Sequence, residues 1–178
     1  MCCCHNMCKV CRIFSFINLI LLVLIIIVFL ILMSNNPAAQ PNILVATAET
    51  GDNTQMGNAV ITFSQNQIVE GNALSHNPGS NEILINENGI YQISYQLTGV
   101  GDEIGRFNFN AVLSVNGTPL GDTLNEGPVI NASNFNNRQT LTATVILRLN
   151  AGDVLQLNGL SQENITYTNA RIDIEKIG

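Results

Sequence analysis

The stretch IYQISYQL, residues Ile90–Leu97, alternates apolar and polar side chains from Tyr91 onward. A period of two is typical of a β-strand that buries one face and exposes the other. Its apolar face carries Tyr91, Ile93, Tyr95 and Leu97. The stretch therefore predicts a half-buried antiparallel strand.

Two other long stretches, Phe107–Val115 and Leu141–Leu149, alternate in the same way. In the second, an apolar face that includes Val145 and Leu147 lies opposite a face of mostly threonine. Shorter candidate strands are Ile43–Ala48, Ala59–Ser64, Gln67–Glu70, Glu82–Ile85, Val154–Leu157 and Ala170–Ile177. Turn dipeptides such as Asn116-Gly117 separate them. Many strands without helical periodicity predict an all-β sandwich or barrel.

Three of these segments resemble known strands. They are NGIYQISYQLTG from Asn88, AVLSVNGTPLGDT from Ala111 and TVILRLNAGDVLQLNG from Thr144. In order and spacing they resemble the jelly rolls of the tumour necrosis factor (TNF) and complement globular-head superfamily. In particular, they look like the C-terminal domain of bacterial collagen-like spore-surface glycoproteins of the BclA type. The resemblance implies a TNF-like jelly-roll β-sandwich that forms a homotrimer and has no enzymatic activity. The chain lacks the collagen repeat of that family.

An apolar run, Ile13–Met33, precedes this domain and contains no charged residue in its 21 positions. As a helix it would be about 31 Å long, close to the hydrocarbon thickness of a bilayer. It therefore predicts one N-terminal transmembrane α-helix. A cleaved signal peptide is the alternative, with a small-residue site at Pro37-Ala38-Ala39, but signal-peptide cores are usually shorter than this run.

The charges beside the run predict its orientation. Lys9 and Arg12 come before it, and the next basic residue is Arg106. The positive-inside rule then places the N-terminus in the cytoplasm and the C-terminal domain outside, as a single-pass membrane protein. The predicted organisation is a cytoplasmic Cys-rich tail (1–12), a transmembrane helix (13–33), a spacer (34–42) and the jelly roll (43–178).

All five cysteines lie in the tail, at Cys2, Cys3, Cys4, Cys8 and Cys11. Three hypotheses about the state of these cysteines stay open: they are reduced or crosslinked thiols, they are S-acylated beside the membrane, or they form a metal site. A soft metal such as zinc would use Cys4, His5, Cys8 and Cys11. The domain after the run has no cysteine, so we expect it to fold without disulfides.

After the run, five basic and thirteen acidic residues give a net charge of −8, which does not suit nucleic acid. Little points to catalysis or to a cofactor. His76 is the one histidine there, in a turn-like SHNPGS segment, and a lone histidine makes neither a triad nor a zinc site. Asp102-Glu103 are expected to be solvated loop acids. Three N-x-S/T sequons occur, at Asn116, Asn131 and Asn164.

We therefore expect a membrane-anchored, non-enzymatic trimeric surface protein that binds an unknown protein or glycan ligand. The alternative is a structural component of a spore or cell-envelope layer. Aromatic and aliphatic side chains on alternating strands are expected to pack in the core or between subunits. The residues assigned to that packing are Tyr91, Ile93, Tyr95, Leu97, Val145 and Leu147.

Overall fold

The computed structural model describes residues 18–29, 41–48, 58–101, 105–128, 130–132, 137–162 and 165–178. The chain forms two compact units, Met1–Gln40 and Pro41–Gly178. In the first unit, residues 18–29 are helical and their apolar side chains are exposed. The remainder of the predicted span and the tail lie outside the described residues. Within the described part of the chain, no helix combines the length and apolar character that crossing a membrane requires.

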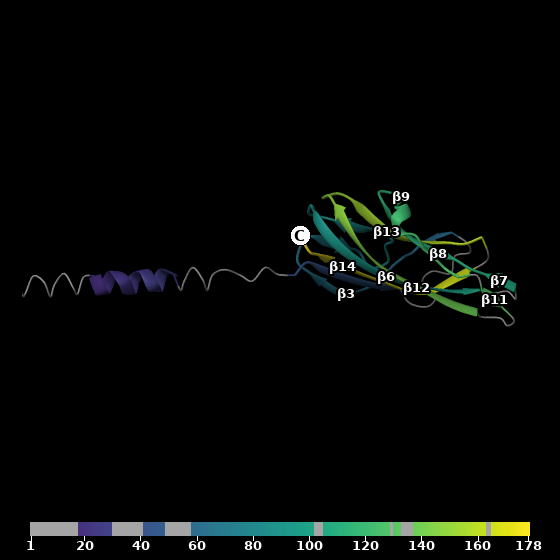
Figure 1. The fold of residues 1–178 in the computed structure, drawn as a ribbon, viewed down its shortest axis with the longest axis horizontal. Coiled ribbons are helices and arrows are strands. Elements are labelled where there is room, and N and C mark those ends of the chain that lie inside the picture. The colour runs from purple at the N-terminus through teal and green to yellow at the C-terminus, as the bar shows by residue number, and fades with distance from the viewer. Residues whose placement is uncertain are drawn as a thin grey trace, which may run out of the picture. The chain divides into compact units, whose positions relative to one another are not determined.

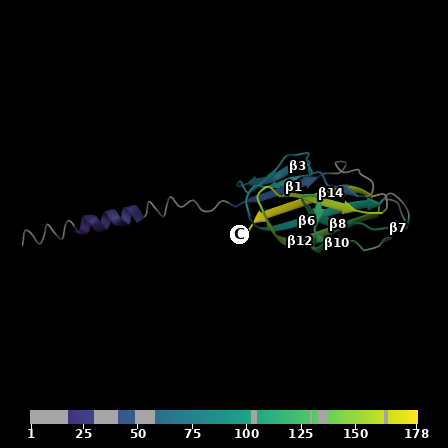
Figure 2. The ribbon, with the colours of Figure 1, turned by 90° about the horizontal axis from the view of Figure 1, so that it is seen from above.

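The second unit is built from β-strands (Figure 1). Its five-stranded sheet has the order β12-β6-β14-β1-β3, and every neighbouring pair is antiparallel. The strands are β1 (Ile43–Ala48), β3 (Gln65–Glu70), β6 (Gly89–Gly101), β12 (Asn137–Leu149) and β14 (Ile165–Lys176). Figure 2 shows the strands of this sheet in a view turned by 90° from that of Figure 1. Because β1 and β14 come from opposite ends of the domain and pair with each other, the sheet is held by contacts between distant parts of the sequence.

A second sheet follows the order β10-β8-β13-β5-β4, with β2 paired to β13 and β9 paired to β8. Its strands are β2 (Ala59–Val60), β4 (Leu74–His76), β5 (Ile83–Ile85), β8 (Asn110–Val115), β9 (Thr118–Pro119), β10 (Asn125–Glu126) and β13 (Val154–Leu160). One short 3-10 helix, η1 (Gly121–Thr123), lies between β9 and β10. A separate two-stranded sheet pairs β7 (Gly105–Phe107) with β11 (Ile130–Ala132).

The inward faces of the two larger sheets form one hydrophobic core. Leu44, Ile93 and Ile172 contribute from the five-stranded sheet, and Leu113 and Leu157 contribute from the other. All five are fully buried or nearly so. Strict alternation produces this result, because alternate residues of a strand point to the same face. The prediction of an all-β sandwich is confirmed.

The strand boundaries differ from the prediction at several places. The stretch Phe107–Val115 is not one strand, because β7 ends at Phe107 and β8 begins at Asn110. The predicted Ala59–Ser64 shortens to β2, while β6 and β12 extend beyond their predicted ends. The short strands β4, β9, β10 and β11 were not predicted. The turn at Asn116-Gly117 is confirmed: both residues have positive φ, 52° and 76°, as a type I′ hairpin turn requires.

Candidate functional site

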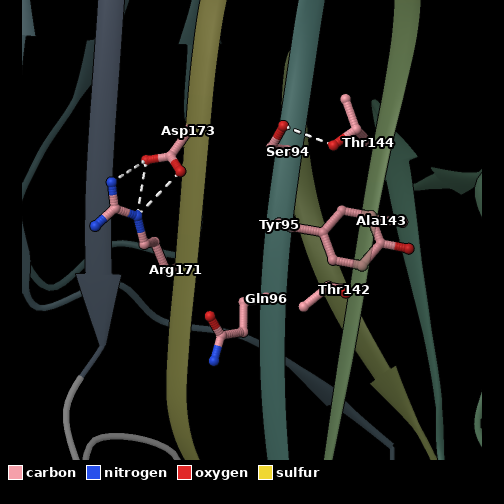
Figure 3. A pocket seen from close by; sticks show the side chains of 8 residues that line it. All are labelled: Ser94, Tyr95, Gln96, Thr142, Ala143, Thr144, Arg171 and Asp173. Atoms are coloured by element: carbon pink, nitrogen blue, oxygen red, sulfur yellow. Dashed lines mark hydrogen bonds and ion pairs between the residues drawn. The ribbon is translucent and has the colours of Figure 1, made fainter.

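The outer face of the five-stranded sheet, turned away from the core, is the candidate site. Here β12, β6 and β14 lie side by side (Figure 3). They border a shallow hollow of about 380 Å³. The residues around it are Ser94, Tyr95, Gln96, Thr142, Ala143, Thr144, Arg171 and Asp173. Tyr95 is buried, and Ala143 lies opposite it in the register, so both side chains are on the core side of the strands. The other six residues around the hollow are polar or charged.

Hydroxyl pairs join β6 to β12 across this face. Ser94 Oγ and Thr144 Oγ1 are 2.8 Å apart, and Thr98 Oγ1 and Thr140 Oγ1 are 2.9 Å apart. Each pair consists of directly opposed residues in the antiparallel register, where side chains on one face of a sheet meet. The two pairs satisfy hydrogen bonding of these four hydroxyl groups, and none of the four carries a charge.

An ion pair lies on β14 at the edge of the hollow. The Arg171 Nε donates to both carboxylate oxygens of Asp173 at 3.0 Å, and Arg171 Nη2 lies 3.0 Å from Asp173 Oδ1. The hydrogen bond to Asp173 raises the pKa of the Arg171 guanidinium above its usual value. Both side chains are well exposed, so the pair adds little stability. It does neutralise the charge at the centre of the face.

Charge separates toward the two sides of the sheet. Arg138 and Arg148 are exposed on β12, the edge strand on one side. Glu70 is exposed on β3, the edge strand on the other side, and Glu175 is exposed on the central strand β14. Both are aligned with Ile43 of β1. Ile146, next to Gln92 on the β12 side, is an apolar residue with 61% of its surface exposed. The face therefore has a basic side on β12 and the neutral Arg171–Asp173 pair on β14, and Glu175 and Glu70, on β14 and β3, form its acidic side.

His76 ends strand β4 and is buried, whereas the sequence predicted a turn position. Its Nδ1 lies 2.6 Å from Asn66 Oδ1 and its Nε2 lies 3.1 Å from the Ser80 carbonyl oxygen. Asn66 Nδ2 also donates to the His76 carbonyl at 2.9 Å, and the ring packs edge-on against Phe63. These contacts tie β3 of one sheet to β4 of the other. The ring nitrogens of His76 thus contact an amide oxygen and a backbone carbonyl oxygen, and neither is a nucleophile. Among the described residues, no group of three or more His, Cys, Asp or Glu side chains could hold a metal ion.

The residues assigned to core or subunit packing lie in the core of a single chain. Tyr91, Ile93 and Leu97 are fully buried, and Tyr95 is 3% exposed. Val145 and Leu147 are half-buried against the same core. Burial raises the pKa of the Tyr91 and Tyr95 phenols. Tyr95 Oη donates to the Thr123 carbonyl at 2.9 Å, which explains how a polar ring is accommodated there.

Several predicted residues lie outside the described part of the chain. They are the tail residues Cys2, Cys3, Cys4, His5, Cys8 and Cys11, the loop acids Asp102 and Glu103, and the sequon residue Asn164. The sequon residue Asn131 belongs to β11, and Asn116 occupies the exposed turn between β8 and β9.

The sequence alone did not predict the charge arrangement of the outer face. It did predict that Ile90–Leu97 has a polar face and that Leu141–Leu149 has a threonine face. The pairing of those two stretches was the missing information, because it is the register of β6 with β12 that brings the hydroxyls together. Arg171 and Asp173 alternate in the sequence and were a detectable signal for an ion pair along one strand face.

Neither a protein-family model nor a curated protein matches the sequence. Solved structures do match. Murine APRIL at pH 8.0 is 13% identical with a TM-score of 0.51, and the match covers 76% of this chain and 99% of that one. The globular domain of zebrafish complement 1qA is 11% identical with a TM-score of 0.52, covering 77% and 98%. At these identities the likeness concerns the fold. The C-terminal unit of this chain has the jelly-roll fold of TNF-family ligands and C1q globular heads.

Proposed function

We propose that the protein is a membrane-anchored, non-enzymatic surface protein whose jelly-roll head forms a homotrimer and serves recognition or adhesion. The jelly-roll fold carries this proposal. Its structural neighbours are signalling and recognition proteins rather than enzymes. The resemblance of three strand segments to the C-terminal domain of BclA-type glycoproteins supports display at a cell surface. Its ligand is a surface protein or a glycan.

The membrane anchor is supported by the sequence of Ile13–Met33. Eighteen of its 21 residues are Leu, Ile, Val or Phe. At about −0.3 to −0.6 kcal/mol each, they favour insertion by roughly 5 to 11 kcal/mol. With Lys9 and Arg12 before it, the anchor places the tail in the cytoplasm and the head outside.

The trimer is supported by the charge arrangement of the outer sheet face. Around a three-fold axis each subunit uses two different surfaces, one toward each neighbour. The basic side of the face, with Arg138 and Arg148, is complementary to the acidic side, with Glu70 and Glu175. In such a ring the basic side of one subunit meets the acidic side of the next, which makes the contact electrostatically favourable.

Detergent extraction and light scattering test the proposal. The full chain, extracted from membranes with Triton, should give a protein mass three times the 19.3 kDa of one chain. Protease added to intact cells should remove the head and leave the tail. A protein mass of one chain at micromolar concentration would reject the trimer, and a mature N-terminus near Gln40 would reject the anchor.

The structural-layer function has one observation in its favour: the five tail cysteines available for crosslinking. Extraction distinguishes it from the anchored head. Resistance to Triton that is relieved by a thiol reductant would support a crosslinked layer, whereas ready extraction without reductant would support the anchored head.

A further inference from the structure

A second hollow, of about 380 Å³, lies where β8 and β13 meet the segment before β2. It is separate from the outer sheet face. Leu160, the last residue of β13, is aligned with Asn110, the first residue of β8. Gly159 is aligned with Ala59, directly after Asn58. The residues that line it are Asn58, Asn108, Asn110, Leu160, Ser161 and Gln162.

Hydrogen bonds hold the wall of this hollow in place. The Ser161 backbone N–H donates to Asn58 Oδ1 at 3.1 Å, and Ser161 Oγ donates to the Asn108 carbonyl at 3.0 Å. On the other side, the Gly127 N–H donates to Asn110 Oδ1 at 3.3 Å. These bonds join three segments that are distant in the sequence. Preorganisation of this kind lowers the entropy that ligand binding would cost.

The same bonds leave side-chain amides available. Asn58 and Asn110 each accept through the carbonyl oxygen, and within the described residues their NH₂ groups donate no hydrogen bond. The side-chain amides of Asn108 and Gln162 form no hydrogen bond with any described residue. An amide offers two N–H donors and one carbonyl acceptor. The hollow therefore presents both donors and acceptors from four side chains.

None of the described residues in the lining is charged. Among them, an anionic ligand would find no lysine or arginine, and a cation would find no carboxylate. An apolar ligand would strip water from the amides without replacing their hydrogen bonds, at a cost of about 1–3 kcal/mol for each. A hydroxyl group, which both donates and accepts, matches an amide in either orientation. Leu160 adds one apolar contact for a C–H surface.

We propose that this hollow binds a neutral saccharide through the amides of Asn58, Asn108, Asn110 and Gln162. Its volume is at the lower end of the range for small-molecule sites, about 300–1,000 Å³, and suits a terminal sugar ring. The inference rests on the recognition role proposed above and specifies a glycan as the ligand. The wall segments fix the site within one chain, so it does not require the trimer.

Ligand-observed saturation-transfer NMR on the full chain tests the site. The protein is held in lauryldimethylamine oxide micelles, because glycoside detergents would compete. The probes are methyl α-mannoside, methyl β-galactoside and methyl N-acetyl-β-glucosaminide, each at about 10 mM, which populates a millimolar site, with methyl glucuronide as the charged counterpart. At least one neutral glycoside should give a signal, and the glucuronide should not.

Matched variants locate the signal. Asn108→Leu removes a lining amide whose side chain holds no internal bond, and affinity should fall about tenfold, the effect of about one hydrogen bond. Gln162→Leu should act in the same way. Asn72→Leu, an exposed asparagine outside the hollow, should leave the signal unchanged. Thermal melts establish that each variant is folded.

Three results would overturn the site: no signal from any neutral glycoside, a signal only from the glucuronide, or equal signals in the Asn108 and Asn72 variants. Light scattering on the same samples keeps the two proposals apart. A binding signal from a protein of single-chain mass would reject the trimer and keep the site, whereas a trimer without a signal would reject the site alone.

Discussion

At the scale of single residues, Tyr95 shows how the two sheets are joined. It belongs to β6 and is 3% exposed. Its hydroxyl donates to the carbonyl of Thr123, the last residue of η1, whose own hydroxyl accepts from the Leu113 N–H of the second sheet. Tyr95→Phe should lower the free energy of unfolding by about 1–2 kcal/mol, because the Thr123 carbonyl is left without its donor. Tyr95→Ala should cost about 3–5 kcal/mol.

Urea denaturation of the full chain in detergent measures both changes. Ser94→Ala is the control, since it removes a hydroxyl from the same strand on the exposed face and should change stability by less than about 0.5 kcal/mol. Equal losses for Tyr95→Phe and Ser94→Ala would show that the buried hydrogen bond contributes nothing specific.

The buried tyrosines also predict how stability depends on alkaline pH. Burial raises the pKa of Tyr91, Tyr95 and most strongly Tyr167 above the usual value, which in the unfolded chain is about 10. Above that pH the unfolded state has lost phenolic protons that the folded state keeps. The folded state then binds more protons, so the free energy of unfolding falls as pH rises.

Denaturation midpoints measured from about pH 8 to pH 11 should be level up to pH 9.5 and decline above it. Lys176, whose pKa is raised by its hydrogen bond to Glu87, contributes a decline of the same sign. Tyr167→Phe separates the two, because its decline should be shallower than that of the wild type. An identical slope in this variant would contradict the assignment to Tyr167.

At the scale of strands, Gly159 of β13 leaves room for the Tyr167 ring of β14 in the opposite sheet. A Cβ at this position would lie 2.3 Å from Cζ of the Tyr167 ring, whereas a Cβ at Gly121 would meet nothing within 4 Å. Gly159→Ala forces a buried ring or a strand to move, and it should cost at least about 1–3 kcal/mol. Gly121→Ala should be close to neutral. A neutral Gly159→Ala in urea denaturation would mean that the ring repacks freely.

The sequence predicted the strands that alternate and missed those that do not. β1 was predicted with its observed bounds, and β6, β12 and β14 were placed with errors only at their ends. β4 and β9 are too short to show a period, and only their pairing with β5 and β8 makes them strands. The break at Asn108-Phe109 was also invisible, because Phe109, Ala111 and Leu113 keep the alternation that the sequence shows.

Sites were harder to predict than strands, because they depend on register. Alternation showed that Ser94 and Thr144 face away from the apolar side, but only the pairing of β6 with β12 makes them neighbours. The amide hollow is lined by residues 58, 108, 110 and 160–162. Nothing local marks these asparagines as a group in an Asn-rich chain. His76 was placed in a turn for the same reason, since its buried contacts come from Asn66 and Ser80.

At the scale of the whole molecule, the proposed trimer must account for Ile146. Its side chain is 61% exposed on the outer face, next to the basic side of the sheet. Burying an isoleucine between subunits contributes about 1.5–3 kcal/mol, and a carboxylate in its place would be costly to bury. Ile146→Asp should therefore dissociate the trimer at micromolar concentration while leaving the fold of each chain intact.

Leu84→Asp is the matched control for this prediction. Leu84 belongs to β5 of the other sheet and is 40% exposed, so its replacement makes the same chemical change away from the proposed interface. Light scattering on the two full-length variants should give the mass of one chain for Ile146→Asp and of three chains for Leu84→Asp, with both folded by circular dichroism. Dissociation by Leu84→Asp alone would move the interface to the second sheet, because the exposed leucine, rather than the charge-divided face, would then be holding the subunits together.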